Sequence, residues 1–101
     1  MTYVSFWLEA AKKGDPKEKP AAHTLPDPPS GRFGPYALRD WATRENLKID
    51  YVDNCWLRVR VQRANLVELF EELYGQEAEI PLAIVAAVSL DCEFTLVAEE
   101  F

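Results

Sequence analysis

The first apolar stretch of the chain, TYVSFWL at residues 2–8, places β-branched and aromatic residues at both sets of alternating positions. Because successive side chains of a strand point to opposite faces, this stretch predicts a strand that is apolar on both faces and therefore central in its sheet. The last stretch, CEFTLVAEEF at residues 92–101, predicts another strand. One face of that strand holds Cys92, Phe94, Leu96 and Ala98.

Residues 47–61, LKIDYVDNCWLRVRV, predict a β-hairpin. A two-residue loop mismatches both faces, whereas a three-residue loop at 53–55 places Asp50 opposite Arg58 and Ile49 opposite Val59. This register puts alternate residues on two distinct faces. The apolar face holds Leu47, Ile49, Tyr51, Leu57, Val59 and Val61, and the other face holds Lys48, Asp50, Val52, Trp56, Arg58 and Arg60.

Two segments have the spacing of amphipathic helices. In residues 34–47, Pro35 stands at a plausible first helical position, and Asp40 and Arg44 are spaced to pair. In residues 65–75, Asn65 is the expected N-cap and Gly75 closes the helix. The second helix has an apolar stripe of Leu66, Leu69, Phe70, Leu73 and Tyr74. Residues 81–90 predict a third, short buried helix, although their β-branched residues suit a strand almost as well.

Residues 12–31 contain five prolines and lack a periodic apolar pattern. Each proline removes a backbone donor and fixes φ, so we expect a long surface loop. The order of elements then predicts one compact domain over residues 1–101 with a ferredoxin-like βαββαβ sandwich. The expected sheet is antiparallel overall, with about four strands and two or three helices on one face. Its first and third strands are central and run parallel to each other.

Charge is divided unevenly along the 101 residues. Residues 1–63 hold all eleven basic residues against eight acids, a balance of +3, whereas residues 64–101 hold nine acids and no base, a balance of −9. The net charge of −6 argues against binding nucleic acid or an anionic membrane, because phosphate contacts need clustered cations. It is compatible with a basic protein partner.

The longest mostly apolar run, residues 80–90, is too short to cross a bilayer, and no basic stretch precedes the apolar N-terminal segment. We therefore expect a soluble cytoplasmic protein. In that compartment Cys55 and Cys92 would be reduced thiols that serve packing.

The residues available for catalysis are few. His23 is the only histidine, which excludes metal sites with two histidines. The adjacent carboxylates Glu71 and Glu72 point about 100° apart on a helix and do not converge on one substrate atom. We expect no enzymatic activity, no cofactor and no metal. An enzyme that uses a cysteine with His23 is the least favoured hypothesis.

Trp56, Arg58 and Arg60 follow one another on one strand face, an arrangement that binds bases and phosphates in RNA-binding sheets. Asp50 opposite Arg58 and the acidic character of the whole chain weigh against that function. Cross-strand pairing, or a rim of cations around a protein contact, is the preferred interpretation.

The acidic second half motivates the leading functional hypothesis, an inhibitor or immunity-type neutraliser of a basic protein such as a nuclease. Acids without neighbouring bases favour steering toward a positive surface. The candidate partner-binding residues are Glu68, Glu71, Glu72, Glu77 and Glu79. The alternative is a small-molecule-binding or regulatory ferredoxin-like domain with its site between the sheet and residues 12–31. Whether the chain forms a homodimer stays open.

Overall fold

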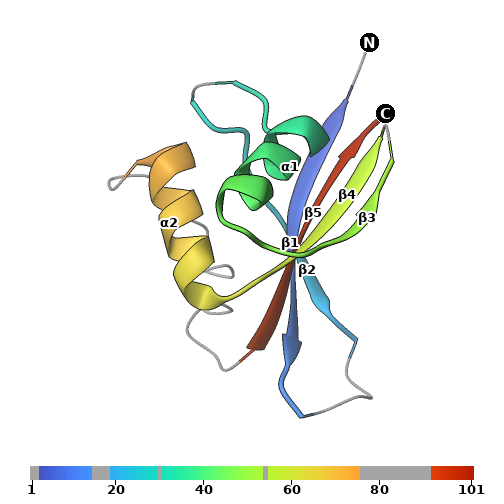
Figure 1. Ribbon diagram of the computed structural model, residues 1–101, viewed down its shortest axis with the longest axis vertical. Coiled ribbons are helices and arrows are strands. Elements are labelled where there is room, and N and C mark those ends of the chain that lie inside the picture. The colour runs from blue at the N-terminus through green and yellow to red at the C-terminus, as the bar shows by residue number, and fades with distance from the viewer. Residues whose placement is uncertain (1–2, 15–18, 30, 54, 76–91) are drawn as a thin grey trace.

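The computed structural model describes residues 3–14, 19–29, 31–53, 55–75 and 92–101. Within these ranges the chain forms five strands and two α-helices (Figure 1). In chain order they are β1 (Val4–Lys12), β2 (Ala21–Thr24), α1 (Pro35–Arg44), β3 (Ile49–Val52), β4 (Trp56–Val61), α2 (Arg63–Tyr74) and β5 (Cys92–Glu100). The predicted helix at residues 81–90 lies outside the described residues.

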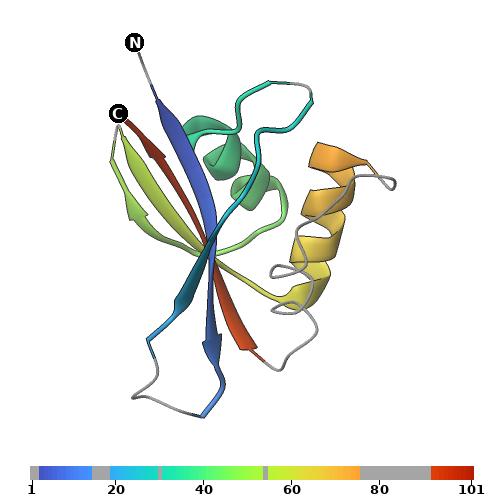
Figure 2. The same cartoon turned by 180° about the vertical axis from the view of Figure 1, so that it is seen from behind.

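All five strands belong to one sheet of order β2-β1-β5-β4-β3, in which every neighbouring pair is antiparallel. The last strand, β5, is the central one and pairs with β1 along its whole length, from Cys92 to Glu100. Both helices lie on the same side of the sheet, as the two opposite views in Figures 1 and 2 show. The fold is therefore a two-layer α+β sandwich, and among the described residues no helix covers the other face of the sheet.

The hydrophobic core lies between the sheet and the helices. Each strand alternates, so one set of side chains points into this layer. Leu8, Leu57, Val59 and Leu96 from the strands are fully buried there, together with Leu38, Trp41, Leu66 and Leu69 from the helices. Burial of this apolar surface is the main favourable contribution to the stability of the fold.

The α+β class, the antiparallel sheet and the helices on one face are confirmed, but the ferredoxin-like arrangement is not. We expected β1 and β4 to be parallel neighbours at the centre, whereas β5 lies between them and is antiparallel to both. The physical reason lies in β5 itself, where the three consecutive residues 96–98 are buried. A strand that is buried on both faces occupies the centre of a sheet.

The proline-rich segment is more ordered than the predicted surface loop. Residues 21–24 form the edge strand β2, and the Leu25 N–H donates to the Phe6 carbonyl oxygen at 2.8 Å. Leu25 and Phe33 enter the core, where Phe33 packs on Phe6 with ring centroids 4.8 Å apart. The prediction failed at residues 21–25 because this stretch contains no proline, so its backbone donors are available to a sheet edge.

The predicted hairpin exists as β3 and β4, and the pairing of Ile49 with Val59 is confirmed. Closer to the turn the register differs, because a β-bulge at Asp50 brings Tyr51 opposite Arg58 and Val52 opposite Leu57. The extra residue of a bulge re-aims the side chains that follow it. Tyr51, predicted for the apolar face, is consequently 46% exposed.

Both predicted helices are present. Helix α1 begins at Pro35 as expected, and α2 ends before Gly75, whose φ of +79° suits glycine. Helix α2 begins three residues earlier than predicted, with Gln62 instead of Asn65 as N-cap. The Gln62 N–H donates to the Asn65 side-chain oxygen at 3.0 Å, so Asn65 completes a capping box from inside the helix. Neither helix, in the part of the chain that is described, is long and apolar enough to span a bilayer.

Candidate binding site on the uncovered sheet face

The face of the sheet turned away from α1 and α2 is called the open face below. Strand pairing places Trp7 of β1, Val97 of β5 and Arg58 of β4 in one row across its centre. Antiparallel sheets commonly have one solvated face, and such a face is normally polar. This one combines aromatic residues with ion pairs.

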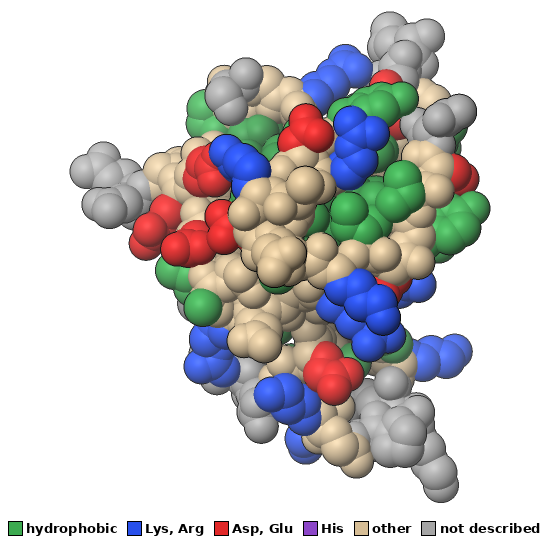
Figure 3. Space-filling model, viewed as in Figure 1, with side chains coloured by type: hydrophobic (Ala, Val, Ile, Leu, Met, Phe, Trp, Pro, Cys, Tyr) green, Lys and Arg blue, Asp and Glu red, His purple; other side chains and the backbone are tan. Residues whose placement is uncertain are grey.

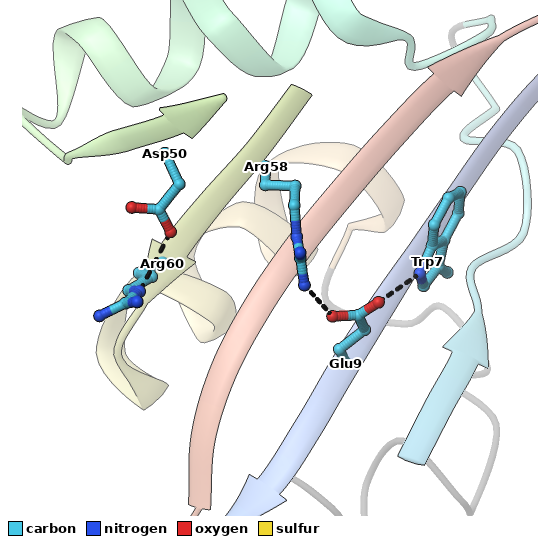
Figure 4. Close-up of polar contacts among 5 residues, drawn as sticks. All are labelled: Trp7, Glu9, Asp50, Arg58 and Arg60. Carbon is cyan, nitrogen blue, oxygen red and sulfur yellow. Dashed lines mark hydrogen bonds and ion pairs between the residues drawn. The ribbon is translucent and has the colours of Figure 1, made fainter. Parts of the chain in front are cut away.

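Val97 is 0% exposed although neither α1 nor α2 covers it. Its cross-strand neighbours are Trp7 on one side and Arg58 on the other. The Arg58 guanidinium reaches over β5 to the Glu9 carboxylate at 2.7 Å, as Figure 4 shows. The indole of Trp7 and this ion pair therefore form a cover that replaces a helix layer above Val97.

Glu9 is the centre of this polar cover. One carboxylate oxygen accepts from Arg58, and the other accepts from the Trp7 indole N–H at 3.2 Å. The Glu9 side chain is 22% exposed and that of Arg58 is 38% exposed. A partly shielded pair with both carboxylate oxygens engaged is stronger than an ion pair in open solvent.

Aromatic residues continue the cover toward the end of the sheet at which both termini lie. Arg58 stands 5.8 Å from the ring centroid of Trp56, and Trp56 packs on Tyr51 with centroids 4.7 Å apart. The Tyr51 hydroxyl donates to Asp53 at 3.2 Å. This hydrogen bond and the charge of Asp53 raise the pKa of the Tyr51 phenol.

Two more aromatic residues stand at the same end. Tyr3 and Phe101 exchange two backbone hydrogen bonds of 3.0 and 2.7 Å, which extend the β1–β5 ladder by one position. Strand alternation puts both on the open face, and they are 63% and 65% exposed. Tyr3, Tyr51, Trp56 and Phe101 are called the aromatic end below.

The opposite end of the open face is charged and concave. A cleft of about 760 Å³ is lined by the far ends of β1, β4 and β5 and by the start of α2. Arg60 extends from β4 beside this cleft and donates its Nε to Asp50 at 3.0 Å (Figure 4). The predicted pairing of Asp50 with Arg58 is therefore replaced by a pairing with Arg60, because of the bulge at Asp50.

The acidic residues predicted as partner-binding lie elsewhere. Glu68, Glu71 and Glu72 are exposed on α2, on the helix side of the sheet, and Figure 3 shows acidic side chains gathered over that helix. Glu72 forms an ion pair of 3.1 Å with Arg44 of α1. A base from the first half of the chain therefore neutralises one of these acids, although the two are far apart in sequence. This contact also replaces the predicted Asp40–Arg44 pair. Glu77 and Glu79 lie outside the described residues.

The two thiols and the histidine are not brought together. Both cysteines are free, and Cys55 lies beside the end of β5, where its carbonyl oxygen accepts from the Glu100 N–H at 2.8 Å. Cys92 begins the same strand, so a full strand length of roughly 25 Å separates the two. His23 lies on β2 opposite Leu8. These residues therefore do not form a joint catalytic site.

Sequence reasoning identified part of the open face. It placed Trp56, Arg58 and Arg60 on one strand face, and the structure confirms that these three share the open face. It missed Trp7 and Glu9, because the apolar residues on both sides of β1 were interpreted as two buried faces, so Trp7 was not expected on an open one. The available signal was the alternation in β1, which sets Trp7 and Glu9 on one side of the strand.

No group of three or more metal-binding side chains occurs within the described ranges. Comparisons with protein-family models, with curated proteins and with solved structures found no match to this chain.

Proposed function

We propose that the chain is a protein-binding module without catalytic activity, and that it binds its partner through the aromatic end of the open face. The observation that carries this proposal is the set of exposed aromatic rings on the sheet face that is turned away from α1 and α2. Tyr51, for example, is 46% exposed although it packs on Trp56. An uncovered patch of this composition is typical of a protein contact.

The composition of the patch supports a protein as the ligand. Tyr, Trp and Arg are enriched at the centres of protein interfaces, because they offer large contact areas and few mobile torsions. Trp56 and Arg58 are held by neighbours on both sides. Side chains that are already ordered lose little entropy on binding, so this surface is prepared for contact.

The net charge of −6 supports a basic partner, in line with an inhibitory or immunity-type role. In this account the two regions of the molecule act at different stages. The acids, Glu68 and Glu71 among them, contribute to a long-range field that speeds the encounter, and the aromatic end determines how long the complex lasts. The proposal places this binding in the cytoplasm, where two free thiols stay reduced.

Nucleic acid is a poorer candidate for the same surface. Both arginines on the open face of β4 already pair with a carboxylate, Arg58 with Glu9 and Arg60 with Asp50. A nucleic acid presents an extended row of phosphates, which would meet these carboxylates repeatedly and would carry the same sign of charge as the protein.

Affinity capture with matched variants tests the proposal. Tagged wild-type chain, a Tyr51→Ala/Trp56→Ala variant and a Glu68→Lys/Glu71→Lys variant are exposed to the same lysate of the source cells, and retained proteins are quantified by mass spectrometry. We expect at least one basic protein that the wild type and the glutamate variant retain and that the aromatic variant loses. Retention that is equal for wild type and the aromatic variant would contradict the proposed interface.

A further inference from the structure

The cleft at the charged end of the open face is not used by the proposed protein contact. It lies at the end of the sheet remote from Tyr51 and Phe101 and has a volume of about 760 Å³, within the usual range of small-molecule sites. Its floor is formed by β1, β5 and β4, and the first residues of α2 form a wall. Such a concave surface on a rigid sheet is suited to a small ligand.

The charges around this cleft differ from those of the rest of the molecule. The residues that line it include four cations, Lys13, Arg58, Arg60 and Arg63, and two carboxylates, Glu9 and Glu93. With Asp50, which pairs with Arg60, the described residues give four cations against three carboxylates, a small positive balance in a chain whose net charge is −6. A positive concavity in an acidic protein favours an anionic ligand at that place.

The arginines keep donors that a ligand can use. Arg60 donates its Nε to Asp50, and Arg58 donates one Nη to Glu9. A guanidinium carries five N–H donors in a planar fork, so each of these arginines has further N–H groups for a second acceptor. The fork geometry matches the paired oxygens of phosphate and carboxylate groups.

The nearer carboxylate does not repel such a ligand strongly. Glu9 accepts from Arg58 with one oxygen and from the Trp7 indole with the other, so its charge is compensated in place. The hydroxyl of Thr95, between Glu9 and Arg60 across the strands, adds a neutral donor to the lining. Four cations and a hydroxyl group outnumber the exposed Glu93 and the compensated Glu9, and this lining is suited to an oxyanion.

We propose that the cleft binds a small soluble oxyanion, a molecule that carries a phosphate or carboxylate group, with Arg60 and Arg58 as its principal contacts. The size of the cleft suits a metabolite, and the net charge of the protein disfavours extended polyanions and anionic membrane surfaces. Arg58 borders both surfaces, but Arg60 and the cleft lie apart from the aromatic end, so either proposal can fail without the other.

Amide chemical shifts of the full-length chain test the site, with sodium phosphate and sodium citrate as probes and sodium chloride at equal ionic strength as reference. We expect saturable shifts at Arg60, Thr95 and Ala64 that chloride does not produce. Arg60→Gln should weaken binding of the better probe by about tenfold or more, because a charge-assisted contact is lost.

Arg39→Gln is the matched control. Arg39 is also exposed, also pairs with an aspartate, Asp40, at 3.5 Å, and stands over the Tyr36 ring, but it belongs to α1 outside the cleft. This variant should bind the probes as the wild type does. Absence of saturable shifts, or an equal loss in both variants, would overturn the site.

A vesicle experiment distinguishes a soluble ligand from a lipid headgroup. Phosphatidylcholine vesicles with and without phosphatidylglycerol are sedimented with the wild type and with Arg60→Gln. We expect no sedimentation of either protein. Sedimentation that requires phosphatidylglycerol and is lost in Arg60→Gln would overturn the assignment to a soluble molecule.

Discussion

Val59 of β4 and Val97 of β5 are both 0% exposed, but they are buried on opposite faces of the same sheet. Val59 belongs to the core beneath the helices, where the surrounding side chains are apolar. Val97 lies under the Trp7 indole and the Glu9–Arg58 ion pair. The two valines show that this small domain excludes water from its sheet in two different ways.

The two covers have different consequences for the surface. A helix buries one side of itself and presents an ordinary polar side to solvent, as α2 does with its glutamates. The cover of the open face is one side chain thick, so the groups that bury Val97 are also the groups that meet solvent. Arg58 and Trp56 therefore contribute to the fold and remain accessible to a ligand.

Shortening each valine to alanine tests this comparison, and we expect it to change the free energy of unfolding more than any other substitution proposed below. Val59→Ala should lower the free energy of unfolding by about 2–3 kcal/mol, because a cavity opens between packed layers. Val97→Ala should cost about 1 kcal/mol, because the partly exposed Trp7 and Arg58 side chains can settle into the space. Urea denaturation measures both. A cost for Val97→Ala equal to that for Val59→Ala would mean that the open-face cover is as rigid as the helix layer.

Double-mutant cycles give the next largest effect. The coupling between Glu9 and Arg58 should be about 1 kcal/mol, because the pair is partly shielded and 2.7 Å apart. The coupling between Arg44 and Glu72 should be about 0.3 kcal/mol and should vanish in high salt, because both side chains are more than half exposed. Equal couplings would remove the special role given to the Glu9–Arg58 pair.

The helix layer also contains a hydrogen bond whose donor, the Tyr74 hydroxyl, can be titrated. The Tyr74 hydroxyl donates to the Pro26 carbonyl oxygen at 2.7 Å, and burial, with a contribution from Asp27, raises the pKa of Tyr74 from 10.0 to about 12. The unfolded chain thus loses this proton at lower pH than the folded chain. Its stabilising contribution is complete below pH 10 and is lost as the pH rises toward 12.

Because Tyr74 is only half buried, we expect that loss to be no more than about 1 kcal/mol. Denaturation of the wild type and of Tyr74→Phe at pH 9 and pH 11 isolates it, since the phenylalanine variant lacks the titrating proton. The difference in stability between the two proteins should shrink at the higher pH. A difference that stays constant would place Tyr74 outside the alkaline transition.

The smallest effect on folding is expected at α2. Glu68→Lys with Glu71→Lys should change the unfolding free energy by no more than about 0.5 kcal/mol, because both side chains are in solvent. Association with a basic partner should instead slow, and more so at low salt. An unchanged association rate would limit the role of the acidic helix to solubility.

Local elements could be predicted from the sequence because their signals are local. Pro35 and Gly75 mark helix ends, and the alternation in residues 92–101 correctly gives the buried face of β5. The order of strands could not be predicted in the same way. It depends on which strand is buried on both faces, and the apolar residues of β1 satisfied that criterion as well as Leu96, Val97 and Ala98 did.

In the candidate site, too, the local pattern could be predicted from the sequence and the contacts between strands could not. The stripe of Trp56, Arg58 and Arg60 was visible from alternation alone, but its meaning depends on partners from other strands. Glu9 is distant in sequence from Arg58, and the contact between them spans β5, which lies between their strands. The bulge at Asp50 brings Tyr51 onto the open face. The alternation of apolar and polar residues in the sequence does not indicate this bulge.

Oxidative footprinting of the captured complex tests the central claim, that the aromatic end of the open face is the binding surface. Tyr51 and Trp56 report on that end, Val67, which is exposed, reports on α2, and Trp41, which is 2% exposed, serves as the internal control. We predict that binding protects Tyr51 and Trp56 from hydroxyl radicals and leaves Val67 unchanged. Protection of Val67 with unchanged labelling of Tyr51 and Trp56 would contradict the account and place the partner on the acidic helix.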